Sequence, residues 1–190
     1  MKIGVTGGIG SGKSLVVETL QSLGAVVYSA DVRAKEIVYR PHIQNRIIEV
    51  FGRNAFQNKV YNTKYIGSIV FSNAYLLSQI NAIIHPEVFR DFEAFSNNHK
   101  DDVIVYESAL MIETSHTYLF DKVILVTAPI ETRIERVMTR DHLDKMTVWN
   151  RMKNQWSDEK KSPFADFIIQ NIDKNETIDQ ITSLWKNHFQ

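Results

Sequence analysis

The chain has 190 residues, of which 44% are hydrophobic, and its 22 basic side chains balance its 22 acidic ones. This length fits one domain, or one domain with an inserted subdomain, and the balanced charge gives no indication of nucleic-acid or anionic-membrane binding. The absence of cysteine excludes disulfides, zinc–thiolate sites and thiol catalysis. No signal peptide and no apolar run of membrane-spanning length is recognisable, so we expect a cytoplasmic protein that binds neither nucleic acid nor membrane.

The most specific motif is a glycine-rich stretch, residues 7–14, directly after the apolar residues 3–6. It matches the pattern G-x-x-x-x-G-K-[ST], whose glycines bring backbone N–H groups against phosphate oxygens without an intervening Cβ. In such loops the lysine, here Lys13, reaches the β- and γ-phosphates, and the hydroxyl of Ser14 ligates Mg²⁺. We therefore predict a nucleoside-triphosphate site, whose contacts are Gly8, Ile9, Gly10, Ser11, Gly12, Lys13, Ser14 and Leu15.

Apolar periodicity predicts an α/β fold in which strands and helices alternate around this loop. A helix is expected directly after the loop, over residues 11–23, and an amphipathic helix over residues 176–189. Four further apolar runs join the first strand to make five predicted strands. These runs are residues 25–29, 102–107, 122–127 and 165–171.

Two acidic residues follow or end predicted strands. Because ligands bind beyond the carboxyl ends of parallel strands, Asp31 and Glu107 are predicted to lie at the same edge of the sheet as the phosphate loop. Alternatively, Asp31 caps a helix over residues 32–38, and Glu107 is a solvated loop residue.

Residues 41–99 lack the alternation of strands and helices and are predicted to be mainly helical, with a turn-rich stretch near residues 52–62. Helices are expected over residues 41–51, 63–71, 73–84 and 87–96. The break at His85-Pro86 is expected because a proline pushes the preceding residue out of helical geometry. We interpret this region as a substrate-binding insertion, in which His85 either contacts substrate or is a buried or capping residue.

The helix expected over residues 130–140 carries three arginines at offsets of three and four, which places them close to one face. They are Arg133, Arg136 and Arg140. A solvated face interleaved with glutamates is one explanation. Because a polar segment and a second basic helix follow, the pattern favours an arginine-bearing lid over about residues 131–159 that closes on a triphosphate.

Together these motifs resemble the dephospho-coenzyme A kinase family along nearly the whole chain. The matching segments are GVTGGIGSGKS, SAD ending at Asp31, IIHP ending at Pro86, ESALMIE from Glu107, RVMTRD from Arg136, RMKNQ from Arg151 and ADFIIQN ending at Asn171. In this chain Glu107 replaces the family's usual aspartate, Ala109 a proline and Leu15 a threonine. None of these departures removes a group that the chemistry requires.

The resemblance implies a P-loop NTPase three-layer α/β fold with a parallel sheet of five strands in the order 2-3-1-4-5. It also implies a helical substrate-binding insertion and a helical lid within a single kinase domain. The core would comprise residues 1–40, 100–130 and 160–190, the insertion about 41–99 and the lid about 131–159.

The reaction that the resemblance implies is transfer of the γ-phosphoryl group of ATP, with Mg²⁺, to the ribose 3′-hydroxyl of dephospho-coenzyme A. Asp31 would accept the proton from, or orient, the attacking hydroxyl, and Arg140, with Arg136, would neutralise charge. The implied catalytic residues are Asp31, Lys13 and Arg140, the substrate-binding residues are Asp31, His85 and Glu107, and Asn171 lies near the adenine. The protein is expected to be a monomer or weak homo-oligomer.

Two other functions remain open at this point. One is a kinase of the same core with a different acceptor, such as a nucleoside monophosphate, shikimate or gluconate. The other is a nucleotide-dependent switch of the GTPase kind, against which the absence of an Asn-Lys-x-Asp motif argues.

Overall fold

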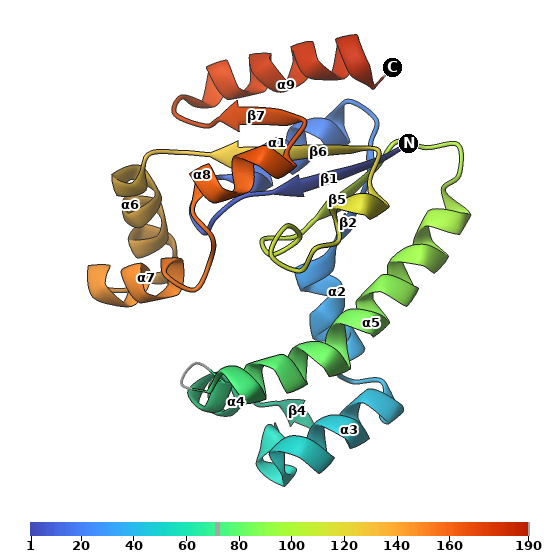
Figure 1. Cartoon of the computed structure of the whole chain (residues 1–190), viewed down its shortest axis with the longest axis vertical. Helices are drawn as coiled ribbons and strands as arrows, with labels where there is room; N and C mark the ends of the chain where they lie inside the picture. Colours follow the sequence, from blue (N-terminus) through green and yellow to red (C-terminus); the bar gives the residue numbers. More distant parts are fainter. Residues whose placement is uncertain (71–72, 190) are drawn as a thin grey trace. The chain divides into compact units, whose positions relative to one another are not determined.

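The computed structural model describes residues 1–70 and 73–189 and divides the chain into two compact units (Figure 1). Unit 1 comprises residues 1–29 and 99–190, and unit 2 comprises residues 30–98. Among the helices of the described ranges, none has the combination of length and apolarity that crossing a bilayer requires.

Unit 1 is built on a parallel sheet of five strands in the order β2-β5-β1-β6-β7. Numbered along the core alone, this is the predicted order 2-3-1-4-5. The strands are β1 Lys2–Thr6, β2 Val26–Ser29, β5 Ile104–Glu107, β6 Lys122–Thr127 and β7 Phe167–Gln170. The strand order reverses at β1, and ligands of open α/β sheets bind at such a reversal, beyond the carboxyl ends of the strands.

The helices of unit 1 include every one predicted for this part of the chain. They are α1 Lys13–Ser22, α6 Ile130–Asp141, α7 Lys145–Met152, α8 Asp158–Lys161 and α9 Lys174–His188, with 3-10 turns at Thr117–Leu119 and Ser162–Phe164. The short helix α8 and the two 3-10 turns were not predicted, because segments of three or four residues are too short to show a helical period.

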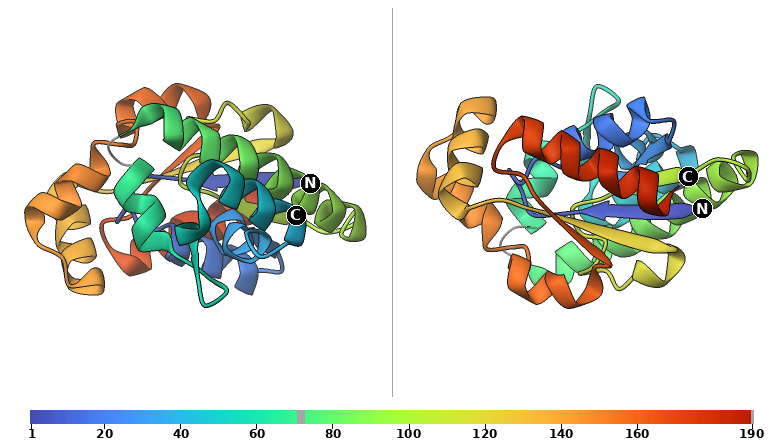
Figure 2. Two further views of the ribbon diagram at one scale, coloured as in Figure 1. Left: turned by 90° about the horizontal axis from the view of Figure 1, so that it is seen from below. Right: turned by 90° about the horizontal axis from the view of Figure 1, so that it is seen from above.

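Both faces of this sheet are covered, as a parallel sheet requires. On one face, Val5 of β1 packs in a buried cluster with Leu20 of α1 and Ile181 of α9. Figure 2 shows α9, in red, lying across the strands on this side. On the other face, Gly4 leaves room for Met111, since a Cβ at position 4 would lie 2.5 Å from the Met111 sulfur. The three-layer arrangement is the one predicted.

Unit 2 is mainly helical, as expected for most of its length. Its elements are α2 Ala30–Ile37, α3 Pro41–Phe51, α4 Thr63–Val70 and α5 Ala74–Asn98, a 3-10 turn at Arg53–Ala55, and the antiparallel strands β3 Phe56–Gln57 and β4 Val60–Tyr61. The small hairpin lies in the predicted turn-rich stretch, and its tip residues Asn58 and Lys59 both have positive φ, as tight hairpin turns require. Phe71, the last residue of one predicted helix, lies outside the described residues.

The predicted break at His85-Pro86 is wrong, because α5 continues through Pro86 without interruption. A proline inside a helix removes one hydrogen bond and costs roughly 3 kcal/mol. Tertiary contacts of the same helix outweigh that penalty. Asp91 of α5 forms an ion pair with Arg33 of α2 at 2.8 Å. The apolar side chains of α5 that are buried on both sides of the proline are Ile80, Ile83, Val88 and Phe92.

Candidate active site

The glycine-rich loop joins β1 to α1 at the carboxyl end of the central strand, where it was predicted. Gly12, at φ 90°, precedes the first turn of α1, and no side chain caps this helix. The amides of Gly10 and Gly12 donate to no group within residues 1–70 and 73–189. Nζ of Lys13 donates to the carbonyl of Gly7 at 2.9 Å. Unused amides, a lysine and the positive end of a helix together form an anion site.

The loop glycines are also required by the segments that pack against them. A Cβ on Gly8 would collide with the guanidinium of Arg133, and a Cβ on Gly12 would collide with the side-chain amide of Asn171. The glycines therefore allow α6 and the end of β7 to approach the loop, besides giving phosphate access to its amides.

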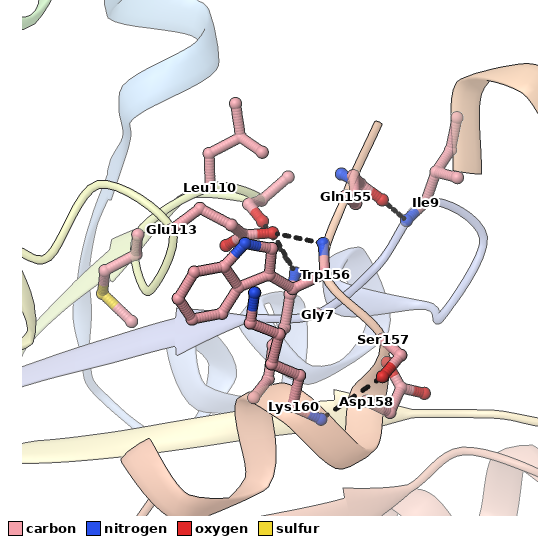
Figure 3. A network of polar contacts seen from close by, with 12 residues as sticks. Gly7, Ile9, Leu110, Glu113, Gln155, Trp156, Ser157, Asp158 and Lys160 are labelled. Carbon is pink, nitrogen blue, oxygen red and sulfur yellow. Dashed lines mark hydrogen bonds and ion pairs between the residues drawn. The ribbon is translucent and has the colours of Figure 1, made fainter. Parts of the chain in front are cut away.

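Ile9, at the apex of the loop, is held through both of its backbone polar groups. Its N–H donates to Oε1 of Gln155 at 2.8 Å (Figure 3). Its carbonyl accepts from Nε of Arg133 at 3.0 Å. The Arg133 side chain is only 7% exposed and pairs with Asp158 at 3.2 Å. Burial raises the pKa of Asp158, and the charge of Arg133 opposes that rise without overcoming it. No pattern in the sequence indicated these contacts.

Asn171, predicted to lie near the adenine, supports the loop. Its side-chain amide donates to the carbonyl of Ser11 at 2.9 Å, and its Oδ1 accepts from the Thr177 hydroxyl at 3.2 Å. Its backbone carbonyl accepts from Nη2 of Arg136 at 3.1 Å. The other terminal nitrogen of Arg136, Nη1, is buried and has no hydrogen-bond partner in the described part of the chain. That nitrogen is suited to an anionic ligand.

Arg140, the third predicted arginine, lies at the exposed end of α6. Its guanidinium donates to both carboxylate oxygens of Asp141, at 2.7 and 3.0 Å. This hydrogen bond raises the pKa of Arg140 and lowers the pKa of Asp141. The three arginines of α6 thus have different partners. Arg133 contacts the loop backbone and Asp158, Arg136 contacts the residue after β7, and Arg140 contacts the neighbouring carboxylate of Asp141.

Glu107 ends β5, the strand beside β1, and its Oε2 accepts from the hydroxyl of Ser29 at 2.9 Å. Ser29 ends β2, directly opposite Glu107 in the register of the sheet. Glu107 therefore lies at the carboxyl edge of the sheet, as predicted. The hydroxyl of Ser14 is exposed and forms no hydrogen bond with any described residue.

Asp31 and His85 belong to unit 2. Asp31 is the second residue of α2, which begins at Ala30, so it lies inside the first turn and does not cap a helix over residues 32–38. Its carboxylate is exposed and has no side-chain partner among residues 1–70 and 73–189. His85 is half-buried in the middle of α5.

A network that the sequence did not reveal links the loop after β5 to the segment after α7. Lys161 is fully buried, and its Nζ contacts Oε1 of Glu113 at 2.8 Å and the carbonyl of Ala109 at 3.2 Å. The same Glu113 oxygen accepts from the backbone N–H of Trp156 at 3.2 Å. Figure 3 shows Glu113, Trp156 and Gln155 beside the glycine-rich loop. Lys161 lies in the sequence DEKK, which is typical of a solvated helix, so no pattern indicated its burial.

A family model described as dephospho-CoA kinase matches residues 1–177 of the chain. A curated dephospho-CoA kinase from Bacteroides fragilis is 37% identical over 187 residues, which cover 97% of this chain and 91% of that protein. The crystal structure of TT1252 from Thermus thermophilus has a TM-score of 0.90 at 27% identity and covers 100% of this chain and 98% of its own. A dephospho-CoA kinase from Campylobacter jejuni, at 25% identity, has a TM-score of 0.62 and covers 97% and 95% of the two chains.

Proposed function

The chain belongs to the dephospho-CoA kinase family, and we propose that its glycine-rich loop and the residues around it transfer the γ-phosphoryl group of ATP to the ribose 3′-hydroxyl of dephospho-CoA. The observation that carries this proposal is the loop itself, with its unused amides and Lys13 at the uncapped start of α1. Phosphoryl transfer depends mainly on positioning and on neutralising charge, and this loop offers both.

For the nucleotide, we propose that the loop amides and Lys13 hold the β- and γ-phosphates. The buried, unpartnered Nη1 of Arg136 supports a phosphate contact, because a phosphate oxygen would satisfy it. Arg140 neutralises charge on the transferred group once it exchanges the Asp141 carboxylate for a phosphate. Asn171 acts on the nucleotide by fixing the loop, and an additional contact with adenine stays a prediction.

Ser14 and Glu107 fit a bound Mg²⁺. Both present oxygen atoms, the ligands that this cation prefers, at the edge of the sheet where the loop lies. The described residues contain no cluster of three or more His, Cys, Asp or Glu that could hold a metal ion, so phosphates and water would complete the coordination. When bound, Mg²⁺ neutralises charge on the phosphate oxygens. Glu107 alternatively holds a substrate hydroxyl.

For the acceptor, we propose that unit 2 forms the substrate-binding insertion and that Asp31 and His85 contact dephospho-CoA. The exposed carboxylate of Asp31, which has no side-chain partner in the described ranges, supports a role as proton acceptor or orienting group for the 3′-hydroxyl. Residues 131–159 serve as the lid, which is attached to the loop through Arg133 and Gln155 and brings Arg140 to the phosphates. A cytoplasmic location and a monomeric or weakly homo-oligomeric state belong to the same proposal.

The decisive variant is Asp31→Asn, which removes the carboxylate and keeps its size. We expect kcat to fall by about 10²- to 10⁴-fold, the usual contribution of a general base, with an unchanged melting temperature because Asp31 is exposed. Glu93→Gln is the matched control, since Glu93 is also an exposed carboxylate of unit 2. A coupled ADP-release assay measures both variants, and wild-type turnover in Asp31→Asn would rule out this role.

The acceptor is tested by offering dephospho-CoA, AMP, shikimate and gluconate under the same conditions. We expect phosphorylation of dephospho-CoA alone. Faster turnover of any other acceptor would contradict the proposed substrate while leaving the kinase chemistry intact.

A further inference from the structure

The starting observation is the hydrogen bond from the Ile9 amide to Gln155, which joins residues 146 positions apart at 2.8 Å. Gln155 follows the end of α7 at Met152, and its own N–H donates to the Met152 carbonyl at 3.0 Å. The side chain of Gln155 therefore reaches from the arginine-bearing region to the apex of the phosphate loop.

Because a peptide unit is planar, this hydrogen bond restricts a whole peptide plane of the loop. The Gly8 carbonyl and the Ile9 N–H belong to one rigid plane, and both ends of that plane are engaged. The Gly8 carbonyl accepts from the Ser11 amide at 3.1 Å, and the Ile9 N–H donates to Gln155. Rotation of this peptide would break both hydrogen bonds, so the contacts fix its orientation.

The next peptide plane is held from its carbonyl side. Arg133 donates to the Ile9 carbonyl at 3.0 Å, and the Gly10 N–H points the opposite way because the peptide is trans and planar. That Gly10 amide is one of the loop amides with no acceptor in the described part of the chain. The Arg133 contact thus keeps the Gly10 N–H directed away from Arg133 before any ligand arrives, and the Gln155 contact holds the peptide plane that precedes it.

Gln155 is itself anchored by its neighbours on the C-terminal side. The Trp156 amide donates to Glu113, which also pairs with the buried Lys161. The Asp158 carboxylate pairs with Arg133, the other side chain on Ile9. The main chain that carries Gln155 is therefore held by buried and half-buried contacts, which place its side chain within reach of Ile9.

We propose that Gln155 is a positioning residue for the triphosphate: it holds the apex peptide of the loop so that the loop amides are oriented for phosphate before ATP binds. This inference rests on the proposed function only in assuming that the loop binds a nucleotide. Such preorganisation strengthens binding because the loop is already ordered, so no binding free energy is lost in ordering it.

The test replaces Gln155 by methionine, which has a similar shape and no acceptor oxygen. We expect ADP binding, measured by calorimetry, to weaken about fivefold to tenfold, the effect of losing one hydrogen bond. The KM for ATP should rise by the same factor while the KM for dephospho-CoA stays constant. Amide hydrogen exchange at Ile9 should be slow in the wild type and fast in the variant.

Gln180→Leu is the matched control, since the Gln180 side chain likewise accepts from a backbone amide, that of Gln170, at 3.4 Å. It should leave ADP binding unchanged. If Gln155→Met fails to fold, Gln155→Asn decides, because it stays polar but is one methylene too short to reach Ile9. Unchanged ADP affinity in a folded variant, or an equal rise in both KM values, overturns the proposal. ADP binding needs no acceptor, so a wild type that failed to phosphorylate dephospho-CoA would refute the proposed function separately.

Discussion

The two ends of α6 present the same side chain in opposite situations. Near its start, Arg133 is 7% exposed and is held by Asp158 and the Ile9 carbonyl. At its end, Arg140 is 64% exposed and contacts only the adjacent Asp141 within the described ranges. Both are arginines of one helix, and the sequence alone suggested that they converge on one target.

The difference indicates that the two arginines have different roles. Nε and Nη1 of Arg133 are directed at protein groups, and removal of this arginine leaves a half-buried carboxylate without its partner. An arginine paired with one exposed carboxylate loses little by exchanging it for a phosphate. We therefore propose that Arg133 belongs to the framework of the loop and that Arg140 takes part in the chemistry.

The largest expected effect is on turnover in Arg140→Ala. We expect kcat to fall by roughly 10³-fold, because an arginine that neutralises the transferred phosphoryl group contributes this much in related reactions. The melting temperature should stay unchanged, since only an exposed ion pair is lost. Steady-state kinetics and thermal unfolding on one preparation measure both.

Lys186→Ala is the control for this variant, because it removes an exposed positive charge from α9 and leaves the site intact. If Arg140→Ala retained full activity, Arg140 would have no part in phosphoryl transfer. Loss of activity together with loss of stability would instead make Arg140 a structural residue.

The second effect is on stability in Arg133→Met. Removing one partner of a buried ion pair is expected to lower the free energy of unfolding by about 3 kcal/mol, at the low end of the usual range because Asp158 is partly exposed. Urea unfolding at pH 7 measures this loss. The double variant with Asp158→Asn should recover part of it, because the uncompensated charge is then absent.

The stability lost in Arg133→Met should also depend on pH, and the ionisation of Asp158 determines the direction. Its folded-state pKa is already raised by burial, and losing Arg133 raises it further. A carboxyl with a raised folded pKa binds protons more tightly in the folded state, so its contribution to stability grows as pH falls towards that pKa. The loss in free energy of unfolding caused by Arg133→Met should therefore be smaller at pH 5 than at pH 7. A larger loss at pH 5 would contradict the ion-pair explanation.

The smallest effect concerns the Asp141 carboxyl. Its pKa is lowered first by the hydrogen bond from Arg140, so Arg140→Ala should raise it towards its usual value. Carbon-13 NMR titration of the carboxyl measures the change. A carboxyl whose pKa is lowered in the folded state stabilises that state at pH values above its ordinary pKa. This contribution is lost as the pH falls through the folded-state pKa. If the pKa of Asp141 in Arg140→Ala equalled its wild-type value, Arg151, whose Nη1 lies 3.5 Å from the carboxylate, would be the residue that holds it.

The loop, the strands and most helices were predictable because their signals are local, whereas the sheet order followed from the family resemblance. An apolar run that forms a buried strand, or a G-x-x-x-x-G-K-S motif, is recognised from residues within a few positions of one another. The contacts that hold Ile9 were not, since Gln155 is 146 residues away and a lone glutamine has no characteristic pattern. Lys161 shows the same limit: a charged tetrapeptide indicates solvent, and only the fold places Glu113 beside it.

Burial can also defeat a strong local signal, as Pro86 in α5 shows, and the way this helix accommodates it has a directional consequence. The carbonyl released by the proline is that of Ala82, and both residues are exposed while Ile83 and Val88 are buried. Water can therefore hydrate the released oxygen, which lowers the penalty. Because a proline ring pushes against the preceding turn on its own side, α5 is favoured to bow with its convex surface towards solvent and its apolar stripe on the inner curve.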